Sequence, residues 1–380
     1  MKKPTRLTAL LGVVTLVLTA CGGSGTDDTT TTVAGGTPTT QGGGSGDACA
    51  VDQVDGDLNF YNWTDYMDPE LVSAFETEYG VDVVEDFYDS NEAMLAQLQA
   101  GAVYDLIVPS DYMVGIMIEE NLLAPLQMDA LSNIGNLDTQ FVNPPYDPTS
   151  EYSVAYQWGT TGLGVNLSVV GEDFEPSWAL VFDTDLTSTY AGGVSLLNDP
   201  RETMGAALKY LGYSLNSTSE TELQEAADVI ADAKANITAF DSDQYEENLV
   251  NGETAVAHGY SGNFFTAFAD TDNEDNWAYV IPEEGGTVWI DNMAVPVVAE
   301  HPCTAFAFMN YLLDAENGAA LTNYNYYASP NAAAEPFILE EVLTDDTIYP
   351  SDELRKKLEI ITDTGDFEIQ YNDFYQLARS

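Results

Sequence analysis

The fold is decided by residues 58–112, which read LNFYNWTDYMDPELVSAFETEYGVDVVEDFYDSNEAMLAQLQAGAVYDLIVPSDY. Short apolar, aromatic or β-branched runs alternate there with segments whose apolar residues recur every three or four positions. This pattern predicts the order βαβαβ, with a strand at 58–61, a helix from Asp68 to Gly80, a strand at 81–87, a helix from Ser90 to Gly101 and a strand at 104–108. Asp68-Pro69 and Ser90 are typical helix starts, and a glycine ends each helix. The order predicts a parallel sheet with helices on both faces.

The same alternation resumes after Trp158. We expect strands at 194–197, 255–259 and 287–290, and helices at 202–211, 221–235, 304–313 and 352–361. The chain is globular in composition from about residue 47 onward, and its length suggests two domains or lobes. We therefore expect an α/β fold with two doubly wound lobes, each a mainly parallel sheet flanked by helices. A ligand cleft would lie between them.

The first 21 residues have the features of a signal peptide. A positively charged start precedes an apolar run at 7–18, which is too short to span a bilayer as a mature helix. The run ends in Leu-Thr-Ala-Cys21, which looks like the lipobox of bacterial lipoproteins, so we expect Cys21 to carry a lipid. An ordinary cleaved signal peptide with an incidental cysteine is the alternative. A lipid would anchor the mature protein on the extracytoplasmic side of the membrane.

Residues 22–49 are made largely of Gly, Thr and Ser. Such a segment buries too little apolar surface to fold, so we expect a flexible linker. The linker would let the globular part reach a membrane partner. A tail with no length requirement is the alternative.

The charge of the chain is strongly negative. Its formal net charge is -53 at pH 7, with 10 Lys and Arg residues against 63 Asp and Glu residues. Nucleic acid is excluded as a partner because phosphate binding requires clusters of basic residues. Most of the acidic excess is typical of a halophile-type solvated surface. Long-range attraction of polycations toward a cleft is the competing explanation.

The cysteines and histidines give no sign of catalysis. Besides Cys21 the chain has only Cys49 and Cys303, and outside the cytoplasm such a pair predicts a disulfide, with two free thiols as the alternative. The two histidines, His258 and His301, have neither metal-ligand spacing nor the partners of a Ser-His-Asp arrangement. We expect no enzyme activity, no metal and no cofactor.

Aromatic and acidic residues follow the predicted strands. They occur in the segments 62–66, 109–112, 198–202, 260 and 289–291. Because the carboxyl ends of parallel strands border the ligand crevice, we expect these segments to meet there. Carboxylates pair with ammonium groups, and aromatic faces pack against methylene chains and attract cations. A site for amino acids would need an arginine to bind the α-carboxylate, and the chain has few.

Several of these segments resemble the bacterial spermidine/putrescine-binding proteins, which are the substrate-binding components of polyamine ABC transporters. The resemblance runs from about Leu58 to Gln376 and rests on the segments 58–66, 88–92, 104–110, 158–166, 199–202, 289–291 and 327–331. It implies a two-lobed periplasmic-binding-protein fold that closes around a polyamine. One lobe would comprise 50–159 plus 291–336, and the other 160–290 plus 337–380.

The resemblance also implies a set of ligand contacts. Aromatic walls for the methylene chain would come from Trp63, Tyr112, Trp289 and Tyr327, with Tyr260 where the family has a tryptophan. Carboxylates for the ammonium groups would come from Asp65, Asp199, Glu202 and Asp291. Further contacts would come from Thr64, Tyr66, Ser110 and, more weakly, Ser242.

Two further departures from the family leave the preferred polyamine open. Asp65 stands where the spermidine receptor has a glutamate, and Ile361 where it has a polar glutamine. Structural roles also compete with ligand contact at several positions. Trp63 and Trp289 are alternatively core residues, and Asp199 is alternatively a helix N-cap. The remaining charged or titratable residues of these segments are expected to be structural: an ion pair for Arg201, capping or exposure for Asp111 and Glu92, and a strand position for His258.

Together these features predict a monomeric extracytoplasmic receptor. It would capture spermidine or putrescine and deliver the polyamine to the permease subunits of an ABC importer. A receptor for another organic cation and a polyamine sensor without a transport role are the alternatives.

Overall fold

The computed structural model describes residues 48–380, which form one compact unit. The predicted signal peptide, Cys21 and nearly all of the predicted linker lie outside the described residues. Within 48–380, no helix is both long enough and apolar enough to cross a membrane.

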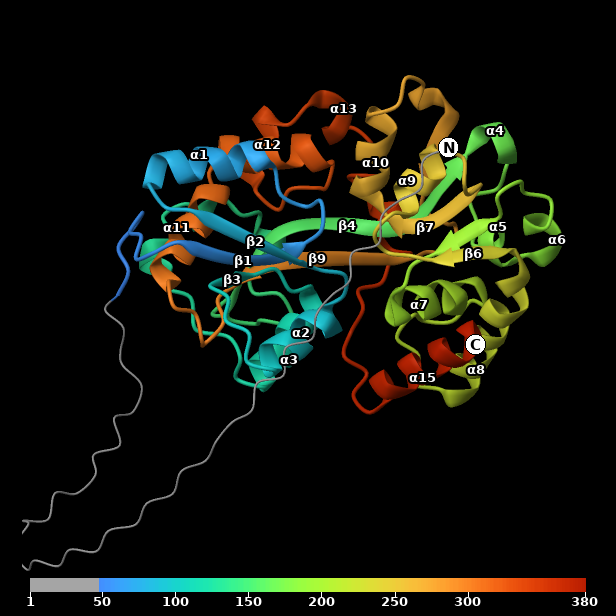
Figure 1. The fold of residues 1–380 in the computed structure, drawn as a ribbon, viewed down its shortest axis with the longest axis horizontal. Coiled ribbons are helices and arrows are strands. Elements are labelled where there is room, and N and C mark those ends of the chain that lie inside the picture. Colours follow the sequence, from blue (N-terminus) through green and yellow to red (C-terminus); the bar gives the residue numbers. More distant parts are fainter. Residues whose placement is uncertain (1–47) are drawn as a thin grey trace, which may run out of the picture. The chain divides into compact units, whose positions relative to one another are not determined.

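A single nine-stranded sheet runs through this unit (Figure 1). Its order is β2-β1-β3-β9-β4-β7-β5-β6, and β8 pairs with β4. The strands are β1 (Leu58–Trp63), β2 (Val83–Tyr88), β3 (Leu106–Ile107), β4 (Ser153–Asn166), β5 (Val194–Leu196), β6 (Ile237–Phe240), β7 (Val256–Tyr260), β8 (Trp277–Val280) and β9 (Thr287–Ala294).

The sheet contains two parallel sets, and these define the two lobes. In the first lobe β1 pairs in parallel with β2 and β3, and in the second lobe β5 pairs in parallel with β6 and β7. The long strands β4 and β9 join the sets by antiparallel pairing, from Ser153 opposite Ala294 to Thr161 opposite Thr287. The expected α/β architecture is confirmed. The shared sheet was not predicted, because β4 was missed.

Helices cover both sets. They are α1 (Pro69–Tyr79), α2 (Asn91–Gln99), α3 (Asp111–Glu119), α4 (Leu167–Val170), α5 (Ala179–Phe182), α6 (Thr184–Thr187), α7 (Pro200–Tyr210), α8 (Glu220–Ala233), α9 (Tyr245–Val250), α10 (Ser261–Ala269), α11 (Pro302–Leu312), α12 (Ala315–Asn325), α13 (Glu340–Leu343), α14 (Asp352–Arg355) and α15 (Phe367–Arg379). Short 3-10 turns lie at η1 (Met128–Ala130), η2 (Ile134–Asn136), η3 (Thr139–Phe141), η4 (Lys234–Asn236), η5 (Glu274–Asn276) and η6 (Ala332–Phe337).

The first helices begin and end where the sequence predicts. The Asp68 carboxylate accepts a hydrogen bond from the Glu70 amide at the start of α1, and Gly80 ends α1 in the left-handed conformation with φ 70°. Ser90 accepts from the Ala93 amide at the start of α2. Local capping therefore places these two helices between their strands.

Each lobe has its own apolar core. Phe60 of β1 and Phe75 of α1 are fully buried against Phe308 of α11, with ring centroids 5.5 and 4.9 Å from that of Phe308. In the second lobe α7, α8 and α15 pack together, and Tyr371 and Tyr375 of α15 are buried in their core. A disulfide between Cys49 and Cys303 joins the first described residues to the start of α11, with 5.3 Å between the Cα atoms.

One predicted helix, 352–361, is wrong beyond Arg355, where α14 ends. The reason is that residue 359 pairs with the sheet instead of continuing the helix. The Glu359 amide donates to the Gly286 carbonyl, and the Val288 amide donates to the Glu359 carbonyl, both at 3.0 Å. We call residues 359–364 the C-terminal strap, and one of its residues, Ile361, lines the cavity described below.

Candidate ligand-binding site

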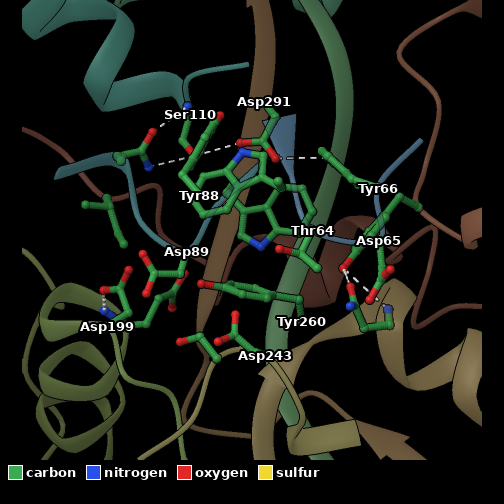
Figure 2. Close-up of a pocket in the computed structure, with 18 of the residues that line it drawn as sticks. Thr64, Asp65, Tyr66, Tyr88, Asp89, Ser110, Asp199, Asp243, Tyr260 and Asp291 are labelled. Carbon is green, nitrogen blue, oxygen red and sulfur yellow. Dashed lines mark hydrogen bonds between the residues drawn. The ribbon is translucent and has the colours of Figure 1, made fainter. Parts of the chain in front are cut away.

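One cavity brings together side chains from both lobes (Figure 2). All thirteen predicted ligand contacts line it, and their ligand-binding role stays a prediction. The lining residues are Trp63, Thr64, Asp65, Tyr66, Tyr88, Asp89, Asn91, Ser110, Asp111, Tyr112, Asp199, Glu202, Ser242, Asp243, Tyr260, Asn263, Trp289, Asp291, Tyr327 and Ile361.

The topology explains why these residues meet. Strand β1 ends at Trp63, β3 is followed by Ser110, β5 by Asp199, β6 by Ser242, and β7 ends at Tyr260. The carboxyl ends of the two parallel sets therefore face the same cavity, as expected for open parallel sheets. Strand β9 crosses between the sets and carries Trp289 and Asp291 into the cavity from its middle.

Asp291 is a buried carboxylate held by two hydroxyl groups. Its side chain accepts hydrogen bonds from the Ser110 hydroxyl at 2.6 Å and from the Tyr66 hydroxyl at 2.9 Å. Ser110 is itself fixed by Asn91, whose amide donates to the Ser110 hydroxyl and whose carbonyl accepts from the Ser110 backbone, both at 3.0 Å. Burial raises the pKa of Asp291 to about 7, although the two hydroxyl donors oppose this shift. A nearby cation would lower the pKa of Asp291 again, because it favours the ionised carboxylate.

Glu202 is the corresponding buried carboxylate of the second lobe. It accepts hydrogen bonds from the Thr161 hydroxyl at 2.9 Å and the Thr287 hydroxyl at 2.7 Å. Burial, and then the negative charge of Asp199, raises the pKa of Glu202 to about 8. The hydroxyl donors come from β4 and β9, so this carboxylate is fixed against the strands that connect the lobes.

Asp199 both caps a helix and lines the cavity. One of its carboxylate oxygens accepts from the amides of Arg201 at 2.8 Å and Glu202 at 3.0 Å, at the start of α7. Burial raises its pKa, while these amides and the Arg201 charge lower it. The predicted cap is confirmed, and the carboxylate also faces the cavity.

Aromatic rings form the remaining walls. The Trp63 indole donates to the Val108 carbonyl at 3.0 Å and lies 4.6 Å from the Tyr88 ring centroid. The Trp289 ring lies 5.2 Å from Tyr327 and 6.1 Å from Tyr260, measured between centroids. Trp289 both lines the cavity and packs in the first-lobe core.

The charged side chains that line the cavity are all acidic. The lining includes seven carboxylates and no lysine, arginine or histidine. Figure 2 shows acidic groups on several sides of the Tyr260 ring. Aromatic faces add attraction for cations. The cavity therefore suits a cationic ligand with apolar segments, and it disfavours anions.

Comparison with known proteins gives the family of this chain. The family described as bacterial extracellular solute-binding protein matches residues 70–351. The chain belongs to this family. The spermidine/putrescine-binding periplasmic protein of Escherichia coli strain K12 is 35% identical to it over 326 residues, which cover 85% of this chain and 91% of that protein. The putrescine/cadaverine-binding protein of Pseudomonas aeruginosa is 34% identical over 313 residues, which cover 80% and 88%.

Solved structures agree with this assignment. A protein from Listeria monocytogenes, described as a spermidine/putrescine ABC transporter, superposes with a TM-score of 0.80 and 34% identity, over 86% of this chain and 99% of that chain. The TpPotD lipoprotein of Treponema pallidum gives a TM-score of 0.74 and 33% identity, over 85% and 99%. The relatives are periplasmic binding proteins, and the expected two-lobed fold is confirmed.

Several residues of this solute-binding protein line the cavity without having been predicted as contacts. Asp89 follows β2, which was predicted, so the rule that strand ends border the cleft could have found it, whereas Asp243 follows β6, which was not predicted. Asn263 binds the Tyr327 hydroxyl through its side-chain oxygen. Tyr88 and Asn91 both lie in the segment 88–92, but neither carries a charge that would have marked it as a contact.

The expectation of capping or exposure for Asp111 needs correction. Its side chain is 1% exposed and accepts from the Tyr112 amide at 2.7 Å and the Ile290 amide at 3.1 Å. It therefore ties α3 to β9 beside the cavity instead of facing solvent. Glu92 is exposed as expected, and it accepts a hydrogen bond from the Tyr112 hydroxyl at 2.9 Å.

Arg201 and His258 have the structural roles expected of them. Arg201 forms an ion pair with Glu368 at 2.5 Å and lies over the Tyr371 ring at 4.4 Å. His258 is fully buried in β7, and burial lowers its pKa to about 3, so it is neutral. Among the described residues, no group of three or more potential ligands could hold a metal ion.

Proposed function

We propose that this protein captures a polyamine such as spermidine or putrescine and delivers it to the permease of an ABC importer. The observation that supports this most strongly is the composition of the cavity lining, with seven carboxylates, no cationic side chain and several aromatic rings. An ammonium group buried without a carboxylate would cost several kcal/mol, so a diamine or triamine suits this lining.

The relatives support the same class of ligand. They are named for binding spermidine, putrescine, cadaverine or agmatine, all of which are organic polycations. We propose that the thirteen predicted contacts bind the polyamine in this chain. The carboxylates would pair with ammonium groups, and the rings of Trp63, Trp289, Tyr260 and Tyr327 would pack along the methylenes. Binding of this kind requires no catalysis and no cofactor.

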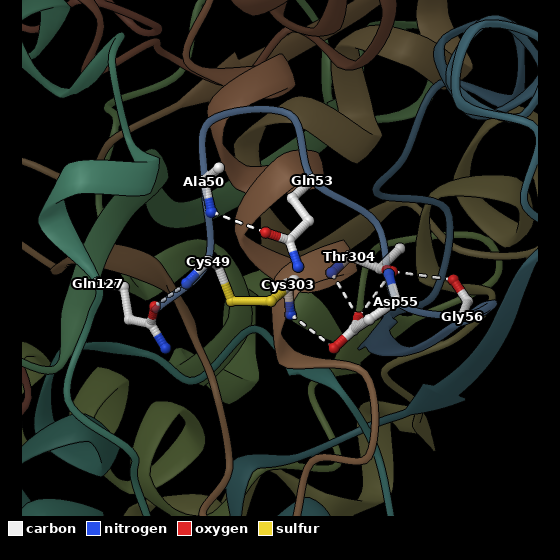
Figure 3. Close-up of a disulfide and its surroundings, with 8 residues drawn as sticks. All are labelled: Cys49, Ala50, Gln53, Asp55, Gly56, Gln127, Cys303 and Thr304. Carbon is white, nitrogen blue, oxygen red and sulfur yellow. Dashed lines mark hydrogen bonds between the residues drawn. A yellow bond between two sulfur atoms is a disulfide. The ribbon is translucent and has the colours of Figure 1, made fainter. Parts of the chain in front are cut away.

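We also propose that Cys21 carries a lipid and that the protein works as a monomer on the extracytoplasmic side of the membrane. The likeness to a Treponema pallidum lipoprotein supports an anchor. The chain that follows the anchor would enter the fold at Cys49, whose disulfide to Cys303 fixes it to α11 (Figure 3). The lobe boundaries would fall within β4, β9 and η6.

Isothermal titration calorimetry tests the proposal. The Cys21→Ser protein, which cannot be lipidated, is titrated with putrescine, spermidine, the monoamine butylamine and the quaternary cation choline. We expect saturable binding of putrescine or spermidine, with butylamine and choline at least 100-fold weaker. Tighter binding of choline than of any polyamine would favour a receptor for another organic cation. No binding of either polyamine would refute the proposal.

A further inference from the structure

A pair of buried amide side chains lies behind the first-lobe wall of the cavity. Gln157 of β4 is 1% exposed, and Asn325 at the end of α12 is 2% exposed. The Gln157 nitrogen donates to the Asn325 side-chain oxygen at 3.0 Å, and the Asn325 nitrogen donates to the Gln157 side-chain oxygen at 2.6 Å. Neither residue lines the cavity. Direct ligand contact therefore does not account for these two buried polar groups.

Asn325 also bonds the backbone of two residues that do line the cavity. Its side-chain nitrogen donates to the Tyr66 carbonyl at 2.9 Å, and its side-chain oxygen accepts from the Tyr327 amide at 3.2 Å. Together with the bonds to Gln157, these contacts use both N–H groups and both lone pairs of the Asn325 amide. The carboxylate of an aspartate could not donate to the Tyr66 carbonyl, so the amide is needed to serve both tyrosines.

Each of these tyrosines directly follows a residue in the left-handed backbone conformation. Asp65, which precedes Tyr66, has φ 54°, and Tyr326, which precedes Tyr327, has φ 58°. Residues other than glycine seldom adopt this conformation, and it persists only where the surrounding structure holds it. Asn325 supplies a hydrogen bond immediately after each of the two turns. One side chain therefore holds both turns.

The positions of Tyr66 and Tyr327 determine the shape of this cavity wall. The Tyr66 hydroxyl donates to the Asp291 carboxylate (Figure 2), and the Tyr66 ring centroid lies 5.1 Å from that of Tyr327. The Tyr327 ring lies in turn 5.2 Å from Trp289. A shift of either turn would therefore move a carboxylate's partner and an aromatic wall together. Because Gln157 lies opposite Asp291 in the β4–β9 ladder, the amide pair joins this wall to the strand beside that carboxylate.

We infer that Asn325 is a positioning residue for polyamine binding, which holds the turns that present Tyr66 and Tyr327 to the ligand and is itself fixed by Gln157. This inference rests on the proposed function. Asn325 acts through the two tyrosines and does not touch the ligand. Its four hydrogen bonds are made in the ligand-free protein, so the wall is ordered before a polyamine enters. Binding then does not bear the cost of ordering these side chains.

Substitution of Asn325 in the Cys21→Ser protein tests this role. Asn325→Leu keeps a similar size and removes all four hydrogen bonds. We expect calorimetry below the unfolding midpoint to show a Kd at least fivefold weaker for putrescine or spermidine, whichever the parent protein binds more tightly. Asn323→Leu is the matched control, because the Asn323 side chain on the same helix donates to the Phe337 carbonyl at 3.1 Å and accepts from the Leu339 amide at 2.9 Å, away from the cavity. The control should lose stability and keep the parental Kd.

A double-mutant cycle with Tyr66→Phe separates positioning from general destabilisation. Tyr66→Phe removes the hydroxyl that orients Asp291 and keeps the ring. Because Asn325 acts through Tyr66, the factor by which Asn325→Leu weakens Kd should be at most half as large in the Tyr66→Phe protein as in the parent. A residue that supports only the fold would give the same factor in both. If Asn325→Leu does not fold, the variant Gln157→Leu/Asn325→Leu, which leaves neither amide of the pair without its partner, replaces it in the cycle.

The outcomes separate this inference from the proposed function. If the parent protein binds neither polyamine, the proposed function fails. If the parent binds one of them and Asn325→Leu weakens Kd by less than fivefold, the positioning role fails while the function stands. The role fails in the same way if the factor in the Tyr66→Phe protein is more than half of that in the parent, or if the Asn323→Leu control loses as much affinity as Asn325→Leu.

Discussion

The hydroxyl of Tyr66 donates a 2.9 Å hydrogen bond to the carboxylate of Asp291, which lies 225 positions further along the chain. Tyr66 follows β1 of the first lobe, and Asp291 lies on β9, which both lobes share. The bond leaves this carboxylate oriented and buried before any ligand arrives. Such preorganisation lowers the cost of ordering side chains on binding.

Asp291→Asn should therefore weaken polyamine binding strongly. The substitution keeps the size of the side chain but removes the charge that would pair with a buried ammonium. We expect a loss of roughly 2–5 kcal/mol, which is about 30-fold to a few thousand-fold in Kd. Calorimetry measures the change, with the exposed Asp173→Asn as the matched control. An unchanged Kd would remove Asp291 from the ligand contacts.

Polyamine affinity should rise with pH between about 6 and 8. With pKa values raised to about 7 and about 8, Asp291 and Glu202 hold protons at pH 6 when the cavity is empty. A bound cation favours their ionised forms, so binding releases protons, and each released proton makes Kd up to about tenfold tighter per pH unit. Calorimetry at pH 6 in buffers of different ionisation enthalpy counts these protons. An equal heat in all buffers would contradict this prediction.

The stability of the ligand-free protein should fall as the pH rises over the same range. A carboxylate whose pKa is raised on folding binds more protons in the folded state than in the unfolded state. Its contribution to the free energy of unfolding is full below about pH 4 and is lost as pH rises through the folded pKa. Glu202→Gln removes one of these groups, so the variant should lose less thermal stability between pH 6 and 8 than the unsubstituted protein.

Gly159→Ala should disturb the Trp289 wall. A Cβ at position 159 would lie 2.7 and 2.8 Å from two atoms of the Trp289 ring and 3.0 Å from Tyr327, so the rings must shift. Since a cation at an aromatic face gains about 0.5–2 kcal/mol, we expect Kd to weaken roughly 2- to 30-fold. Gly135→Ala, where nothing lies within 4 Å of the added atom, should leave Kd unchanged.

Removal of the disulfide should lower stability without changing the ligand contacts. Replacing both Cys49 and Cys303 with serine opens a covalent loop with a sequence separation of 254, and we expect a loss of about 2–5 kcal/mol in the free energy of unfolding. Urea unfolding with and without reductant measures this loss. The reductant should destabilise the parent protein and leave the double variant unaffected; destabilisation of both would point to another cause.

Local sequence patterns predicted those helices whose start, end and apolar face are determined by residues close together in the chain. The caps at Asp68 and Ser90 and the apolar periodicity behind them gave α1 and α2. Strand β4 was missed because it is buried along its full length, so it has no alternation of polar and apolar residues. The end of the helix predicted at 352–361 was wrong because Glu359 is held by the distant residues 286 and 288, which no local pattern reveals.

The same distinction applies to the cavity. Residues directly after predicted strands, such as Asp199 and Ser110, could be placed there because topology brings strand ends together. Asp111 was misjudged because its burial depends on Ile290, 179 positions away. The ion pair expected for Arg201 is confirmed, but its partners were not predicted, because Thr362 and Glu368 lie 161 and 167 positions further along the chain.

The ladder between β4 and β9 is regular except at one point, where its register shifts between Ala155 and Gln157. Gln157 is the residue that pairs with Asp291. A register shift of this kind disrupts the ladder locally and bends the strand that carries it. The pair of strands that joins the two parallel sets is therefore irregular directly beside the Asp291 carboxylate. A cation that binds Asp291 would lie at this irregular point of the connection between the lobes.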